Sequence, residues 1–134
     1  MRFAKLILGL SLLLIFTSAQ ADDKKGVKDV VYVTLEPGIV TNYGGPGRLK
    51  YLRADITLMA ESLDDQVILE KEAPLIRNTL VFSLSRQPEN NVSTPAGQER
   101  MKQLLLQDVQ EALIREVGQP IVIEVLFTSF IFEN

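Results

Sequence analysis

Apolar and polar residues alternate along two segments in the first half of the chain, which predicts two β-strands. Val30–Leu35 is rich in β-branched and aromatic residues, and the sequence Glu36-Pro37-Gly38 ends or bends this strand. In Leu49–Ala60 every second residue is apolar, and the residues between them are largely polar. A period of two is typical of an antiparallel sheet that packs one face on a core and exposes the other.

The middle of the chain changes to helical spacing. We predict a helix over Glu61–Arg86, interrupted at Pro74 by a kink or by the start of a second helix. Proline lacks the amide donor that a helix interior needs, but it fits the first helical turn. The polar residues of Gln87–Val92 predict a loop.

A second long helix has clear start and stop signals. Thr94 offers a capping hydroxyl before Pro95 at the first helical position, and Gly118 suits a left-handed cap. Apolar residues recur between them at three- and four-residue spacing, so we expect an amphipathic helix that packs on a sheet. A membrane-surface helix is the alternative, but the polar face carries Gln and Glu in place of a lysine-rich band.

The last segment, Ile121–Phe132, has few polar residues, and we predict a central strand covered on both faces. The predicted order is therefore two strands, two long helical segments and a final strand. This order indicates a small α+β domain in which an antiparallel-type sheet packs on two long helices.

Three glycines and a basic pair in the stretch TNYGGPGRLKY (41–51) raise the question of a phosphate-binding loop. Such a loop needs a strand before it and a helix N-terminus after it, because the free amides of the helix bind the anion. Here a strand follows, and the Gly-Lys-Ser/Thr sequence is absent. We therefore predict a turn between two strands.

The first residues have the order of a secretory signal peptide. Arg2 and Lys5 precede an apolar run, and Ala19 and Ala21 form a small-residue cleavage site before a charged stretch. The run is shorter than the ~20 residues that span a bilayer as a helix, so we expect cleavage after Ala21 in preference to an uncleaved anchor. We divide the chain into a signal peptide (1–21), a linker (22–29) and one domain (30–134).

The chain contains no cysteine and no histidine. Disulfides, thiol chemistry, nucleophile systems that need histidine and the usual zinc ligands are therefore excluded. Without Arg2 and Lys5, the exported part has 12 basic and 17 acidic residues, a net charge of −5. Nucleic acid and anionic lipid are disfavoured as main partners, and a small acidic domain without disulfides fits a bacterial periplasm.

Carboxylates are the remaining candidates for catalysis. Glu61 and Asp65 share a helix face, but that face is expected to be solvated. Glu70 and Glu72 are likewise expected to be solvated and not catalytic. We therefore predict that the protein is not an enzyme and holds no cofactor or metal.

Two arginines and the aromatic residues of the last strand also need an interpretation. Arg77 either binds a carboxylate of a partner or buries its stem and pairs with a neighbouring acid, and we favour the second. Arg53 is expected to be solvated. Phe127, Phe130 and Phe132 are expected to lie in the core and not to form a ligand cage.

Five segments, taken in order, resemble the FliL family of flagellar basal-body proteins. They are VYVTLEPGIV (31–40), GRLKYLRADITLMAE (47–61), APLIRNTLVFSLS (73–85), STPAGQERMKQLLLQDVQEALI (93–114) and IVIEVLFTSFIFE (121–133). The residues that carry the resemblance include Pro37, Asp55, Pro74, Arg77, Thr94, Pro95, Gly97 and Phe127. The resemblance covers nearly all of the chain after the signal.

The resemblance implies a periplasmic domain similar to the stomatin/prohibitin-type (SPFH-like) fold. It also implies a non-enzymatic accessory that forms rings around the periplasmic linker of the flagellar stator and keeps the stator active under load. The expected partners are the stator linker and the basal body, together with further copies of this chain or an anchored relative in a mixed ring. The expected location is the periplasm, at the flagellar basal body.

One feature departs from the family pattern. Members usually carry a cytoplasmic lead and a transmembrane anchor, whereas this chain has five residues before what resembles a cleavable signal. If the segment stays uncleaved, the chain is anchored in the inner membrane; if it is cleaved, membrane association depends on partners. The alternative function is a soluble periplasmic binding or scaffold protein of an envelope complex unrelated to the motor.

Overall fold

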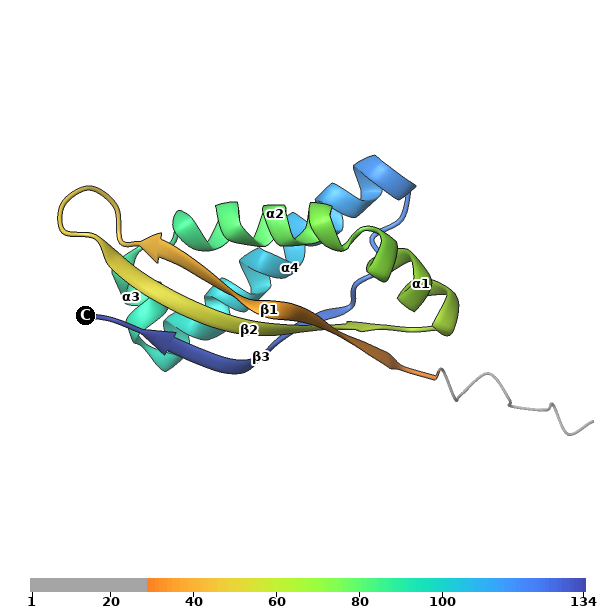
Figure 1. Ribbon diagram of the computed structural model, residues 1–134, viewed down its shortest axis with the longest axis horizontal. Coiled ribbons are helices and arrows are strands. Elements are labelled where there is room, and N and C mark those ends of the chain that lie inside the picture. Colours follow the sequence, from red (N-terminus) through yellow and green to blue (C-terminus); the bar gives the residue numbers. More distant parts are fainter. Residues whose placement is uncertain (1–28) are drawn as a thin grey trace, which may run out of the picture.

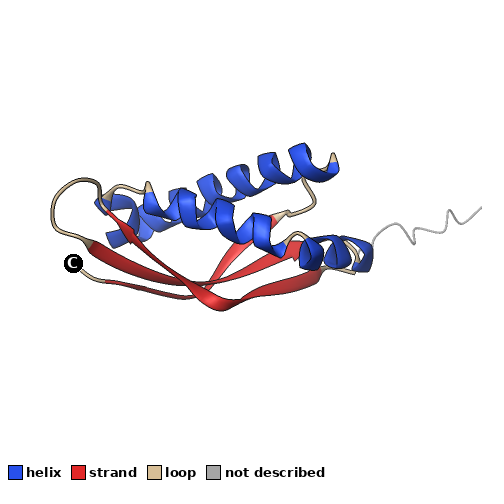
Figure 2. Cartoon of the chain, turned by 45° about the horizontal axis from the view of Figure 1, so that its top comes forward, coloured by secondary structure: helices blue, strands red, loops and turns tan. Residues whose placement is uncertain are grey.

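A three-stranded antiparallel sheet lies on one side of the molecule and the helices lie on the other (Figures 1 and 2). The computed structural model describes residues 29–134, so Ala19, Ala21 and nearly all of the predicted linker lie outside the described residues. The elements in chain order are β1 (Val31–Tyr43), β2 (Lys50–Ala60), α1 (Leu63–Lys71), α2 (Ala73–Ser85), α3 (Glu89–Ser93), α4 (Pro95–Val117) and β3 (Glu124–Phe132).

The central strand is β2, which pairs with β1 on one side and with β3 on the other. The residues of β2 that face the helices are at most 1% exposed; they are Leu52, Ala54, Ile56, Leu58 and Ala60. They pack with buried residues of α2 and α4, among them Ile76, Leu80, Leu105 and Leu113. The prediction of an α+β domain with an antiparallel sheet on two long helices is confirmed.

The predicted place of the last strand is wrong. β3 is an edge strand that pairs with β2 alone, and Ile131 on its outer face is 61% exposed. Its three phenylalanines, which are partly exposed, pack against the core as predicted: Phe127, Phe130 and Phe132. Ile56 pairs with Phe127 and Asp55 pairs with Ser129, so Thr128 forms a bulge that turns Phe127 and Phe130 to one face. Because the bulge breaks the alternation of two, apolar residues fall at both odd and even positions of β3. The sequence of this edge strand therefore resembles that of a strand covered on both faces.

The helical segment divides at Glu72. α1 ends at Lys71, and α2 begins at Ala73 with Pro74 in its first turn. Of the two predicted roles for Pro74, the start of a second helix is the observed one. Ser62 caps α1, because its hydroxyl accepts a hydrogen bond from the Asp65 amide at 3.1 Å.

The loop predicted over Gln87–Val92 is instead largely the short helix α3. Val92 is fully buried, and its carbonyl accepts a hydrogen bond from Gln98 Nε2 at 2.8 Å. Lys50 of β2 forms an ion pair at 2.5 Å with Glu89 in the first turn. Contacts with β2 and α4 therefore help to hold these polar residues in a helix, and the sequence of residues 87–92 does not contain that information.

The start of α4 joins it tightly to α3. The Thr94 hydroxyl accepts from the Gly97 amide at 3.0 Å and donates to the Asn90 carbonyl at 2.6 Å. A Cβ atom on Gly97 would lie 2.2 Å from the Asn90 carbonyl oxygen and 2.5 Å from Asn91 Cα. Any side chain at Gly97 would therefore push the two helices apart. At the other end, Gly118 has φ 81° and forms the expected left-handed cap.

The glycine-rich stretch connects β1 to β2 as a hairpin loop, which confirms the predicted turn. Gly44, Gly45 and Gly47 have positive φ, a region that other residues rarely adopt. The Gly44 amide donates to the Gln87 carbonyl at 3.2 Å and so ties the loop to the end of α2.

Tyr43 links the two outer strands. Its side chain is buried at the end of β1, and its hydroxyl donates a hydrogen bond to the backbone carbonyl of Glu133, just after β3. Burial raises the pKa of the Tyr43 phenol; the positive charge of Lys50 opposes this, and the charges of Glu89 and Glu133 add to it. The folded state thus favours the neutral phenol of Tyr43 over its ionised form.

We predict that Gly97→Ala lowers the free energy of unfolding by roughly 1–3 kcal/mol, because backbone atoms of α3 occupy the space that the methyl group needs. Urea unfolding would measure the loss. Ala96→Ser, at an exposed position of the same turn, is the control and should change little. Equal stability of the two variants would contradict the close approach of α3 and α4.

We predict that Tyr43→Phe costs about 1 kcal/mol at neutral pH through the lost hydrogen bond. A folded-state pKa above the unfolded value of about 10 contributes stability that is fully present below pH 10 and is lost as the pH rises through the folded pKa. The variant should therefore lose less stability between pH 9 and 11 than the parent. Thermal unfolding against pH, with Tyr32→Phe as an exposed control, would show it; identical alkaline slopes would rule it out.

Candidate binding site at the bulge of β1

The strand β1 is interrupted by a bulge at the sequence that was predicted to end or bend it. The pairing with β2 shifts between Leu35 and Ile39, and the peptide bond between Glu36 and Pro37 is cis. Proline cannot donate to the ladder, so Pro37 is accommodated in a strand only at an edge or a bulge. β1 therefore continues through this sequence with a change of register.

Arg77 of α2 holds the bulge from the helical layer. Its Nη1 donates to the Pro37 carbonyl at 2.5 Å, and its Nη2 donates to the Gly38 carbonyl at 3.2 Å. Our expectation of an acidic neighbour as the partner is corrected, because Arg77 binds two successive backbone carbonyls. The planar guanidinium suits this arrangement, since it presents several N–H groups in a fixed fork.

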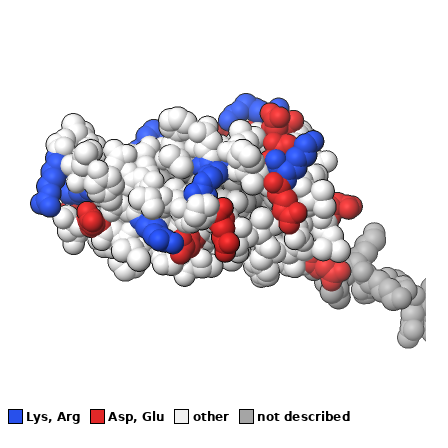
Figure 3. Space-filling view, viewed as in Figure 1, with Lys and Arg blue, Asp and Glu red and all other residues white. Residues whose placement is uncertain are grey.

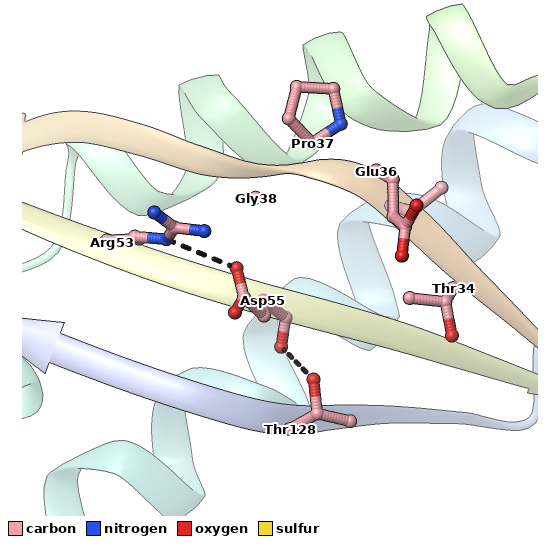
Figure 4. A pocket seen from close by; sticks show the side chains of 8 residues that line it. Thr34, Glu36, Pro37, Gly38, Arg53, Asp55 and Thr128 are labelled. Atoms are coloured by element: carbon pink, nitrogen blue, oxygen red, sulfur yellow. Dashed lines mark hydrogen bonds and ion pairs between the residues drawn. The ribbon is translucent and has the colours of Figure 1, made fainter.

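Asp55 of β2 supports the bulge from the open face of the sheet (Figure 4). A Cβ atom on Gly38 would lie 2.0 Å from Asp55 Oδ1, so glycine is what allows this close approach. Arg53 Nε donates to Asp55 Oδ1 at 3.4 Å, and the Thr128 hydroxyl donates to the Asp55 carbonyl at 3.2 Å. Arg53 was expected to be only solvated; it is half exposed but forms this ion pair.

Two hollows flank the bulge. The first, of about 540 Å³, opens on the sheet face and is lined by Thr34, Leu35, Glu36, Pro37, Gly38, Arg53, Asp55 and Thr128 (Figure 4). The second, of about 380 Å³, lies between β1 and the α1–α2 junction and is lined by Val33, Thr34, Leu35, Glu36, Glu70, Ala73, Pro74 and Arg77. Both combine apolar walls with a few charged groups, which is a composition suited to binding.

Of the carboxylates named from the sequence, Glu70 lines the second hollow at the bulge, together with Glu36. Glu61 and Asp65 line a separate hollow of about 240 Å³ beside Gln110. Within residues 29–134, no three histidine, cysteine or carboxylate side chains lie close enough together to hold a metal ion.

The residues that carry the family resemblance fall into two groups in space. Pro37, Asp55, Pro74 and Arg77 surround the bulge, and Phe127 precedes the Thr128 that contacts Asp55. Thr94, Pro95 and Gly97 instead form the start of α4. Glu36, Gly38 and Thr128 also line the hollow at the bulge, and the sequence interpretation did not name them as residues of a site. The sequence Glu-Pro-Gly inside a strand was the available signal for a bulge with close backbone contacts.

Comparison with known proteins gives a consistent result. The family model described as "Flagellar basal body-associated protein FliL" matches residues 32–132. The chain is also similar to the "Flagellar protein FliL" of Aquifex aeolicus (strain VF5), with 32% identity over 101 residues. The match covers 74% of this chain and 59% of that relative, so the chain spans about three fifths of the length of the relative it matches.

We predict that Arg77→Gln destabilises the fold by about 1–3 kcal/mol, because the carbonyls of Pro37 and Gly38 lose charge-assisted partners. Urea unfolding and amide exchange at Gly38 and Ile39 would measure the change. Arg86→Gln, at the exposed end of the same helix, is the matched control and should cost under about 1 kcal/mol. If both variants lose the same stability, the bulge does not depend on Arg77.

Proposed function

Because the chain belongs to the FliL family of flagellar basal body-associated proteins, we propose that it is a non-enzymatic accessory of the flagellar motor that associates with the stator and supports motility under load. The family match over residues 32–132 carries this proposal. It runs from the second residue of β1 to the last residue of β3 and so includes nearly all of the described fold. The match covers only 59% of the relative's length, so the contact with the stator remains part of the proposal.

We propose the periplasm as the location, with cleavage of the signal peptide after Ala21. The order of charges, apolar residues and small residues before the domain supports this location. Within the described part of the chain, no helix is both long and apolar enough to cross a membrane. Attachment to the basal body then depends on contacts of the folded domain with its partners.

The sheet offers a surface for such contacts. Helices cover one face of the sheet, and the other face is open (Figure 2). Four large side chains on the open face are between 45% and 63% exposed: Tyr32, Val40, Tyr51 and Ile131. Exposed apolar groups on one face are typical of interaction surfaces, and they support assembly with the stator linker, with further copies of this chain or with an anchored relative in a mixed ring.

We predict that an intact fluorescent fusion of this protein forms foci at flagellar bases and that the foci disappear when the stator genes are deleted. Deletion of the gene for this protein should slow tethered cells, which work against high load, more than it slows free swimmers. Fluorescence microscopy and bead-assay torque would measure the two effects. Complementation with the parent gene is the control.

Other outcomes would redirect the proposal. Foci that persist without stators would keep the protein at the basal body and remove stator binding as its anchor. A diffuse periplasmic signal in both strains, with normal torque in the deletion strain, would refute the motor role. It would favour a scaffold of another envelope complex.

A further inference from the structure

The outer edge of β1 is free. β1 pairs with β2 alone among residues 29–134, and the helices contact it from the covered face of the sheet. An unpaired edge presents backbone N–H and C=O groups that can pair with another extended chain. Natural edge strands are commonly protected by proline, bulges or charge. In β1, Pro37 and the bulge between Leu35 and Ile39 interrupt the edge, and the residues before them lack such protection.

The directions of the backbone groups follow from the neighbouring strand. The Met59 carbonyl accepts a hydrogen bond from the Ile123 amide at 2.9 Å, so the backbone groups of Met59 face β3. Met59 pairs with Tyr32, and in an antiparallel pair Tyr32 must then face away from β2. The direction of the backbone groups repeats every second residue. Thr57 therefore also faces β3, and its partner Thr34 faces away from β2.

The Thr34–Thr57 contact agrees with this assignment. The two hydroxyl oxygens are 3.0 Å apart, which fits a non-hydrogen-bonded pair. In such a pair the side chains lie closer together, and the backbone groups of the two residues point away from each other. Tyr32 and Thr34 therefore present two N–H and two C=O groups at the free edge. Arg77 limits this edge, because its guanidinium already binds the carbonyls of Pro37 and Gly38.

A groove runs beside these groups on the helical side. Its apolar walls include Val33, Leu35, Ala73 and Pro74, and exposed Glu36 and Glu70 add two negative charges at its rim. Arg77 also lines the groove, but its guanidinium is bound to the carbonyls of the bulge. Figure 3 shows acidic and basic side chains interspersed on this view of the molecule, with several acidic ones toward the α1 end. The residue of an added strand that lies opposite Val33 would point into the groove.

We propose that the edge of β1 at Tyr32–Thr34 binds an extended segment of a partner protein as a fourth strand. The chemistry of the edge and groove defines this segment. It carries backbone amides free to pair with Tyr32 and Thr34, small apolar side chains on alternate residues for the groove, and lysine or arginine near Glu36 and Glu70. Main-chain pairing supplies affinity, and the groove and the two acids supply selectivity, as in other strand-addition complexes.

The probe is a capped synthetic peptide, Lys-Val-Thr-Val-Thr-Val-Lys. It is titrated into ¹⁵N-labelled protein produced from the complete gene, so that any processing takes place in the cell. We expect saturable amide shifts at residues 31–36 and at the α1–α2 junction. N-methylation of both threonine amides should abolish binding, because these amides pair with Tyr32 and Thr34. N-methylation of the valine amides, which point away, should preserve it.

A charge-reversal pair tests the selectivity. Glu36→Lys/Glu70→Lys should weaken binding of the peptide about three- to tenfold, because two attractions become repulsions. Glu111→Lys/Glu116→Lys makes the same change of charge at exposed positions of α4 and should leave binding unchanged. Circular dichroism checks that each variant is folded.

Several results would overturn the proposal. They are an absence of saturable shifts on β1, shifts confined to another surface, or equal binding of the two N-methylated peptides. Concentration-dependent dimerisation that protects the Tyr32 and Thr34 amides would replace the partner segment by a second copy of this chain. The test uses purified protein, so its outcome is independent of where the protein acts in the cell.

Discussion

The burial of one face of β2 beneath α2 and α4 is the constraint on which the rest of the fold depends. β2 is paired along both edges, and its inward side chains are almost completely removed from water. Hydrophobic burial of this kind is the main favourable contribution to folding, and it fixes the register of a half-buried strand. The outer strands and α2 take their positions from it, and α2 in turn places Arg77 at the bulge of β1.

Local signals in the sequence predicted much of this architecture. The alternation in β2, the turn glycines, the capping residues of α4 and the role of Pro74 each depend on neighbours in the chain, and those elements were predicted correctly. The place of β3 and the helix α3 were not predicted. Strand order depends on pairing between residues such as Leu52 and Phe132, 80 positions apart, and α3 is held by contacts with β2 and α4.

The candidate site was visible from the sequence only as scattered parts. Pro37, Asp55 and Arg77 could be named, but their relation could not, because Arg77 was expected to pair with a side chain and it binds backbone carbonyls. Every residue has a backbone carbonyl, so the sequence does not indicate which carbonyls accept hydrogen bonds from an arginine. The need for glycine at position 38 also becomes evident only when Asp55 is seen beneath it.

The bulge of β1 also limits how long a contact at this edge can last. An uninterrupted edge of 13 residues would allow extended pairing of the kind that makes fibrils and swapped domains slow to separate. Before the bulge, only two residues present outward groups, and each backbone hydrogen bond contributes a net ~0.5–1.5 kcal/mol. Since differences in affinity lie mainly in the rate of dissociation, such a short contact exchanges rapidly. A partner strand bound at this edge, as proposed above, would thus be released and remade while the domain itself stays folded.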